Sequence, residues 1–307
     1  MGEAASSPVV PRSGRSLTPL GRRTRPSDVA SRWAHRARRA RTLLADRPHT
    51  APLLQFYLSV LELQTSVCAP IDASRWVAVS AAPGGDTPRI QLEQLPLDEL
   101  SVEFSTFCRE MPETAPDPVS WAARAVTRAE SRTQVDLLLS LLTGGEFATL
   151  GGALACEPVP LAFLARAFLS PMAEALSALA PTGAPARAPV CPQCGWPPQV
   201  SRLEDESHTQ GMRRLVCAFC AAAWGFPRAV CPACGVSGDD GLVFHVDESL
   251  PHLRVEACKT CRHYLKSVDL RVLGLAEPLV DDLATPELDL WATEQGLDKI
   301  APNLLGL

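Results

Sequence analysis

Four Cys-x-x-Cys pairs are the residues in this 307-residue chain whose types and spacing best suit chemistry. Two cysteines separated by two residues can bind one tetrahedral ion from a single tight turn, and a second such turn completes the ligand shell. The sequence therefore predicts two metal sites of four thiolates each. The predicted ligands are Cys191, Cys194, Cys217, Cys220, Cys231, Cys234, Cys258 and Cys261.

The pairs form a tandem repeat, since CPQCG at 191–195 returns as CPACG at 231–235. The gaps within the two units are 22 and 23 residues, which suit a zinc-ribbon or rubredoxin-like hairpin. We pair the turns sequentially, first with second and third with fourth, although a cross-braced pairing would satisfy the same spacings. Gly195 and Gly235 follow the second cysteine of their turns, where positive φ is often needed. Ala221 and Arg262 hold the equivalent places elsewhere, and we expect plainer turns there.

Other uses of these cysteines fit the spacing less well. A thioredoxin-type site needs one pair beside a βαβ pattern, and ferredoxin clusters need three closely spaced cysteines. Structural disulfides would require an oxidising compartment. Iron and zinc both accept four sulfurs, so the ligands leave the identity of the ion open. They also leave open whether the metal acts or only stabilises the ribbons.

The composition is that of an ordinary soluble protein, with 46% hydrophobic residues and a net charge of −5. No apolar run approaches the roughly 18 residues of a membrane helix, so we expect no membrane insertion. The Arg22-Arg23 pair invites a twin-arginine export interpretation, but residues 24–28 are not apolar, and we expect a cytoplasmic protein. The remaining cysteines are predicted to be buried thiols. These are Cys68, Cys108 and Cys156.

An arginine-rich front end precedes a helical domain. Residues 1–26 are predicted to be a disordered basic tail, and ten arginines lie between Arg12 and Arg41 against one acid, Asp28. They could bind an anionic partner, but we favour a basic tail that runs into an exposed helix face. Apolar periodicity predicts an all-α domain over 27–180, in which no catalytic cluster or phosphate-binding loop is legible, so we expect no enzyme. Its helices are expected at about 27–47, 50–67, 98–110, 117–130, 133–142 and 159–179.

The rest of the chain is predicted to be a linker, two ribbons and an acidic end, which makes the fold class α+β. We place the linker at 181–189, the four-cysteine ribbons at 190–229 and 230–270, and the acidic segment at 271–307. Alternating apolar residues in the ribbons indicate short β-hairpins. Thr285 as N-cap, with Pro286 at the first position, predicts a short acidic helix that ends before Gly296.

The charges of the ribbons argue against a nucleic-acid surface. Eight Lys/Arg and eight Asp/Glu fall between positions 191 and 266, and four thiolates leave a divalent site with about two negative charges. Asp281 and Asp282 could bind a metal or a partner's arginine, but loop and cap roles are favoured. Four histidines are expected to be solvated or hydrogen-bonded rather than ligands. These are His208, His245, His252 and His263.

Several stretches together resemble the FdhE family of formate dehydrogenase accessory proteins. The resemblance covers roughly 190–305 strongly and the helical part weakly, at 54–58 and Gln64. This sequence departs from the family pattern at Pro286 and in its arginine-rich front end. The resembling stretches are CPQCG (191–195), RRLVCAFC (213–220) with Trp224, CPACG (231–235), CKTCRHYLK (258–266) and DDLATPELD (281–289).

The resemblance implies a cytoplasmic assembly factor rather than an enzyme. Members of this family support maturation of formate dehydrogenase by contacting its catalytic subunit, and they carry rubredoxin-type sites with iron. The resemblance thus names a partner, the catalytic subunit, and makes iron an alternative to zinc. Two further hypotheses stay open, namely a tandem zinc-ribbon protein that binds nucleic acid and a rubredoxin-like redox protein.

Overall fold

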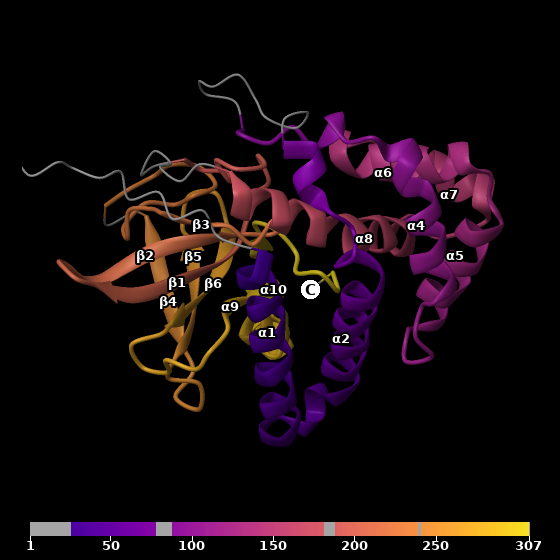
Figure 1. The fold of residues 1–307 in the computed structure, drawn as a ribbon. Coiled ribbons are helices and arrows are strands. Elements are labelled where there is room, and N and C mark those ends of the chain that lie inside the picture. Colours follow the sequence, from indigo (N-terminus) through magenta and orange to yellow (C-terminus); the bar gives the residue numbers. More distant parts are fainter. Residues whose placement is uncertain (1–25, 78–87, 181–187, 239–240, 307) are drawn as a thin grey trace, which may run out of the picture.

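The computed structural model describes residues 26–77, 88–180, 188–238 and 241–306, and of residues 26–28 only the backbone. The predicted basic tail and most of the predicted linker lie outside these residues. Figure 1 shows a bundle of helices on one side, a β-sheet on the other, and helix α1 between them. The α+β class expected from the sequence is confirmed.

The helical part is built from amphipathic helices, most of which are joined by short turns. Helix α1 ends just before Pro48, as predicted, and Gly144, with φ of 69°, ends α6 in the left-handed conformation. Single turns of 3₁₀-helix cover Pro48–Thr50, Ala73–Trp76 and Leu92–Gln94, and a π-turn covers Gln64–Cys68. The helices are α1 (Pro26–Asp46), α2 (Ala51–Leu63), α4 (Leu97–Arg109), α5 (Asp117–Arg128), α6 (Ser131–Thr143), α7 (Phe147–Leu154) and α8 (Pro158–Leu179).

Helix α7 is missing from the sequence prediction, which places a break at the Gly151-Gly152 pair. The structure shows both glycines inside the helix. A Cβ on Gly151 would meet the carbonyl oxygen of Cys156 at 2.6 Å. Gly151 therefore allows the chain to fold back closely after the helix, and the glycine reflects packing rather than a helix end.

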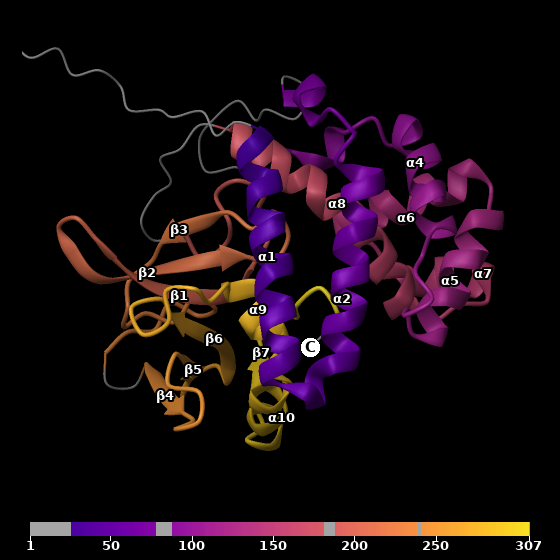
Figure 2. The same ribbon diagram turned by 60° about the horizontal axis from the view of Figure 1, so that its bottom comes forward.

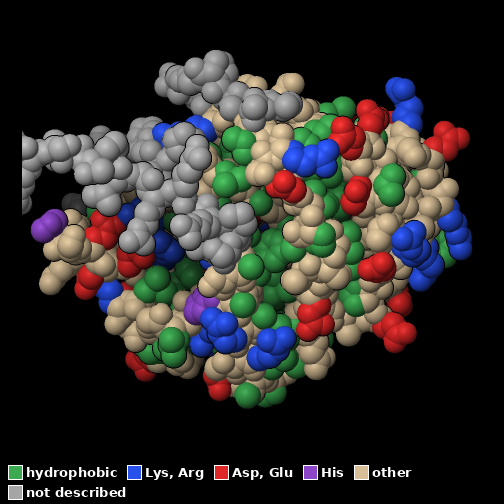
Figure 3. Space-filling model, in the orientation of Figure 1, with side chains coloured by type: hydrophobic (Ala, Val, Ile, Leu, Met, Phe, Trp, Pro, Cys, Tyr) green, Lys and Arg blue, Asp and Glu red, His purple; other side chains and the backbone are tan. Residues whose placement is uncertain are grey.

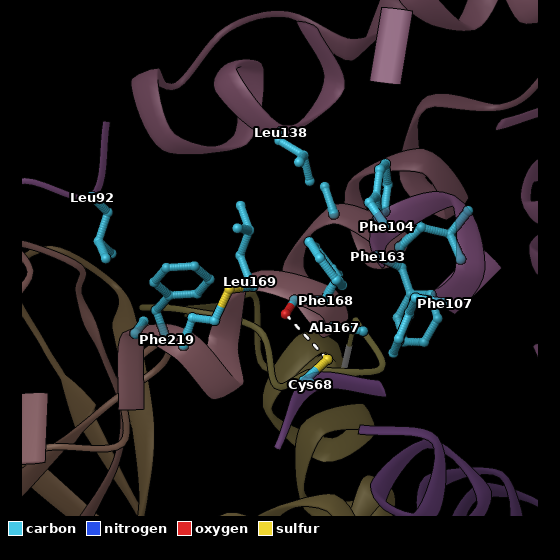
Figure 4. Close-up of a cluster of buried hydrophobic side chains, with 14 of the residues drawn as sticks. Cys68, Leu92, Phe104, Phe107, Leu138, Phe163, Ala167, Phe168, Leu169 and Phe219 are labelled. Carbon is cyan, nitrogen blue, oxygen red and sulfur yellow. Dashed lines mark hydrogen bonds between the residues drawn. The ribbon is translucent and has the colours of Figure 1, made fainter. Parts of the chain in front are cut away.

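Helix α8 is the centre of the largest hydrophobic cluster. The ring of Phe168 lies 5.1 Å from that of Phe104 and 5.7 Å from that of Phe107, as drawn in Figure 4. Cys68 donates to the carbonyl of Phe168, and burial raises the pKa of the Cys68 thiol well above its usual range. The cluster continues into the first ribbon through Phe219, so helices and ribbon share one core.

The length of α8 corrects one expectation from the sequence. By length and composition this 22-residue helix could span a membrane, whereas we expected from the sequence that no apolar run would be long enough. In the structure 78% of its most apolar stretch is buried inside the protein. A core helix of a soluble protein passes the same test of length and composition.

The two ribbons form one sheet. In the described residues its strand order is β3-β2-β1-β6-β5-β4, and β7 also pairs with β6. The ribbons meet where β1 and β6 run parallel, with Val200 opposite Lys266 and Leu203 opposite Asp269. The strands are β1 (Pro198–Glu206), β2 (Thr209–Cys217), β3 (Ala223–Gly225), β4 (Leu242–Val246), β5 (Leu253–Cys258), β6 (His263–Asp269) and β7 (Asp298–Lys299).

The acidic end connects the sheet to the first two helices. Helix α10 (Pro286–Glu294) begins at the predicted proline, and Gly296 follows its end with φ of 68°. Helix α9 (Pro278–Leu283) was not predicted, and it packs between α1 and strands β1 and β6. Figure 2 shows this arrangement from below, with α9 and α10 beside α1. A small hydrophobic cluster joins α1 and α2 to α9.

Candidate metal centres

The eight predicted ligands come together as two groups of four sulfurs. Within each group the Sγ atoms all lie within 4.8 Å of one another, and the closest pairs are 3.4–3.7 Å apart. A tetrahedral ion with metal–sulfur bonds of about 2.3 Å requires sulfurs about 3.8 Å apart. A disulfide would hold them at about 2.05 Å. The groups are Cys191, Cys194, Cys217 and Cys220, and Cys231, Cys234, Cys258 and Cys261.

This grouping has the sequential pairing, because each group joins the two turns of one ribbon. The cross-braced alternative does not describe this geometry. We name the groups the first site (Cys191, Cys194, Cys217, Cys220) and the second site (Cys231, Cys234, Cys258, Cys261). In each site the four sulfurs are placed to bind one ion. Metal binding by these eight cysteines stays a prediction, for which the ligand atoms are suitably placed.

All four turns share one backbone conformation. The residue after the second cysteine has positive φ in each turn: Gly195 80°, Ala221 54°, Gly235 75° and Arg262 61°. The expectation of plainer turns at Ala221 and Arg262 was wrong. The chain must reverse tightly to bring both sulfurs to one point, and this requires the left-handed region whatever the residue. A residue with a Cβ is disfavoured there by about 1–2 kcal/mol.

The first site is enclosed by the helical domain. Trp196 and Phe219 stack beside it with ring centroids 4.3 Å apart. Arg166 reaches it from α8 and donates to the carbonyls of Ala218 at 2.7 Å and Asn303 at 2.8 Å. Arg166 thereby joins α8, the second turn of the site and the C-terminal segment.

Arg166 also places a positive charge beside the sulfurs. Burial lowers the pKa of its guanidinium to about 10, and the negative charges of Cys217 and Asp282 oppose that effect. Its guanidinium carbon lies 5.8 Å from the centroid of the Trp196 ring. Because four thiolates and a divalent ion carry about two negative charges, Arg166 would partly neutralise a loaded first site. Nothing in its sequence surroundings marks this residue, which lies in the middle of an apolar helix.

The second site lies nearer the surface. Cys231 and Cys258 are buried, Cys261 is half-buried and Cys234 is exposed. Burial acts to raise the pKa of the Cys258 thiol, but the backbone N–H groups of Cys261 and Thr260 outweigh it and lower that pKa to about 7. Thiolate character at this position suits a metal ligand.

The histidines take other roles. His252 Nε2 lies 3.1 Å from Asp281 Oδ1, His263 Nδ1 lies 2.9 Å from the Cys261 carbonyl, and His245 stacks on Trp291 at 3.8 Å. None of them belongs to a possible metal-binding group within the residues that the structure describes.

Asp281 and Asp282 are buried in ion pairs with cations of the same chain. Asp281 accepts two hydrogen bonds from Arg39 of α1, and its Oδ2 accepts one from the backbone N–H of Glu277. Asp282 lies 2.9 Å from both Lys266 and Lys299. The favoured cap role is thus only part of their function, because both carboxylates connect α9 to neighbouring elements.

The arginine-rich helix α1 is correspondingly less exposed than expected. Arg36 donates to Glu174 of α8, Arg39 pairs with Asp281, and both arginines are buried. The prediction of an exposed basic face was therefore wrong for these two residues. Of the remaining cysteines, Cys68 and Cys108 are buried as predicted, whereas Cys156 is only partly buried.

The fold and the two cysteine groups define a class of protein in which a helical domain is joined to a duplicated four-cysteine ribbon. Comparison with known proteins agrees with this class. Residues 190–228 match the central domain of FdhE, and residues 231–305 match its C-terminal domain. The match is thus to both of these FdhE domains, and it confirms the resemblance seen in this part of the sequence.

Individual relatives agree with this assignment. The Protein FdhE homolog of Aquifex aeolicus is 40% identical over 116 residues, 38% of this chain and 41% of that protein. The homolog of Stutzerimonas stutzeri is 37% identical over 116 residues, 38% of each chain. The match thus spans about two fifths of the length of these relatives. The crystal structure of the FdhE protein from Pseudomonas aeruginosa shares the fold, with a TM-score of 0.66, 23% identity and coverage of 89% of this chain and 94% of that one.

Proposed function

We propose that this protein is a non-catalytic, metal-binding accessory factor for the maturation of formate dehydrogenase. The observation that carries the proposal is the pair of four-sulfur sites in the part of the chain that matches the two FdhE domains. Four sulfurs within 4.8 Å of one another suit zinc or iron, and either ion would stabilise the ribbons when bound. We further propose that the protein acts in the cytoplasm and docks on the catalytic subunit of the enzyme.

The polar groups of the chain support a binding role over a catalytic one. Acidic and basic side chains that could exchange protons, such as Lys266 and Asp282, are buried and paired with each other. Such pairs connect elements of the fold.

Nucleic-acid binding has less support. On the face in Figure 3, acidic and basic side chains are interspersed over the helical part. Arg36 and Arg39, two of the ten arginines of the front end, are committed to Glu174 and Asp281 and do not face phosphate. A phosphate-binding surface would require cations of one sign gathered on one face.

The proposal is tested by affinity purification of the tagged full chain from its native host, with mass spectrometry of co-purifying proteins and metal analysis of the same sample. We expect enrichment of the formate dehydrogenase catalytic subunit. A Cys231→Ser, Cys258→Ser variant controls for dependence on the second site. Recovery of nucleic acid, with the catalytic subunit expressed but absent from the sample, would contradict the proposal.

A further inference from the structure

The two sites have the same four ligands but different surroundings. Three cysteines of the first site, Cys191, Cys217 and Cys220, are at most 1% exposed, and they belong to the hydrophobic cluster that includes α8. In the second site Cys234 is exposed, and no cysteine of that site belongs to a hydrophobic cluster of the described residues.

Equivalent positions in the two repeats show the same difference. A Cβ on Gly195, in the first site, would meet the ring of Pro88 at 2.9 Å. A Cβ on Gly235, in the second site, would have nothing within 4 Å. The same turn is therefore covered in the first ribbon and open in the second.

Hydrogen bonds also attach residues 88–90, which cover the first site, to its first turn. The backbone N–H groups of Arg89 and Ile90 donate to the carbonyls of Pro192 and Gln193, which lie between the two cysteines of the first turn. In the second ribbon the corresponding turn is framed by the bridge between Val230 and Ser237, two residues of its own loop. Opening the first turn would disturb the core, whereas opening the second would disturb one loop.

We propose that the second site exchanges its metal ion, with Cys234 as the first sulfur to leave, and that the first site retains its ion while the protein stays folded. An incoming chelating ligand would displace Cys234 Sγ from the ion, and the released thiolate would take up a proton from solvent. The oxidation state of the ion does not change. The inference rests on the proposed metal binding and is independent of the proposed enzyme partner.

The test uses the full chain loaded with two equivalents of zinc and challenged with excess 4-(2-pyridylazo)resorcinol, whose zinc complex absorbs visible light. We expect two kinetic phases of one equivalent each, with rates that differ by about tenfold or more, because opening a surface loop takes less free energy than opening a core. Release of both equivalents in one phase would overturn the proposal.

Serine variants at matched positions assign the phases. Cys234→Ser should lose the fast phase and keep the slow one, whereas Cys194→Ser, the equivalent change in the first site, should keep the fast phase. The reverse assignment would overturn the proposal.

Alkylation of the unmodified protein gives a measurement that does not depend on the folding of variants. Among the eight predicted ligand cysteines, limited iodoacetamide followed by peptide mass spectrometry should label Cys234 first, with loss of one zinc equivalent. Labelling of Cys194 before Cys234 would refute the proposed order, and a full chain that binds no zinc would refute metal binding itself. Neither result bears on co-purification with formate dehydrogenase.

Discussion

Replacement of Lys266 by methionine tests the buried ion pairs that connect the sheet to the acidic end. The ammonium group is fully buried and lies 2.9 Å from Asp282 and 2.7 Å from Asp289. It also donates to the backbone carbonyl and hydroxyl of Thr285, at 3.1 and 3.2 Å. Methionine has a similar length, so the change removes the charge and leaves little empty volume.

The magnitude follows from what the two carboxylates retain. Removal of one partner from a buried ion pair typically destabilises a protein by about 3–5 kcal/mol. Lys299 remains 2.9 Å from Asp282 and 3.0 Å from Asp289, so one cation still neutralises one of the two carboxylates. We therefore expect a loss near the lower end, about 3 kcal/mol in the free energy of unfolding.

The assay is urea denaturation followed by circular dichroism, with the metal content held constant. Arg41→Met is the control, because Arg41 forms an exposed pair with Glu62, with side chains 58% and 72% exposed, and should lose less than about 1 kcal/mol. If Lys266→Met came within about 1 kcal/mol of this control, the ion pairs would not connect these elements as argued.

Changes at three other places test further parts of the structure. Burial acts to raise the pKa of Asp281, but hydrogen bonds from His252 and Arg39, together with the charge of Arg39, outweigh it and lower that pKa. The ionised carboxylate therefore stabilises the folded protein at pH values above the ordinary pKa of aspartate, and this stabilisation is lost as pH falls through the lowered pKa. Asp281→Asn should therefore be less stable than the parent at pH 7, with a difference in melting temperature that shrinks below about pH 4. Cys191→Ser and Cys231→Ser should each lose one metal equivalent by elemental analysis. Only Cys191→Ser should also weaken the helical part in hydrogen exchange, and equal weakening by both would contradict the shared core. Ala221→Gly should raise the free energy of unfolding by about 0.5–1 kcal/mol, and Gly235→Ala should lower it by a similar amount, because both positions have positive φ. The melting temperatures of the two variants should shift in the corresponding directions, and shifts of the opposite sign would refute this.

The sequence predicts the local features of this protein best. Two cysteines in one tight turn, or apolar residues at helical spacing, depend on neighbours in the chain. The two groups of four cysteines and most helices therefore agree with the prediction, and metal binding by these cysteines stays a prediction. Arg39 and Asp281 lie 242 positions apart, and neither shows in its own surroundings that the other neutralises it. The burial of the arginines and the cover over the first site depend on such distant pairs. Ala221 shows a second limit, because the fold imposes a conformation that its residue type does not indicate.

The parallel junction between β1 and β6 fixes how the duplicated halves relate to each other. The first ribbon contributes its first strand, β1, to this junction, and the second ribbon contributes its last strand, β6. The two ribbons therefore use different strands at the junction, and their arrangement is not symmetric. The two ligand sets therefore have one fixed separation and direction, set by backbone hydrogen bonds. A molecule that approaches this protein meets two chemically alike centres in unlike positions, one closed against the helices and one facing outward. Duplication has thus produced two centres that can diverge in function without any change in their ligands.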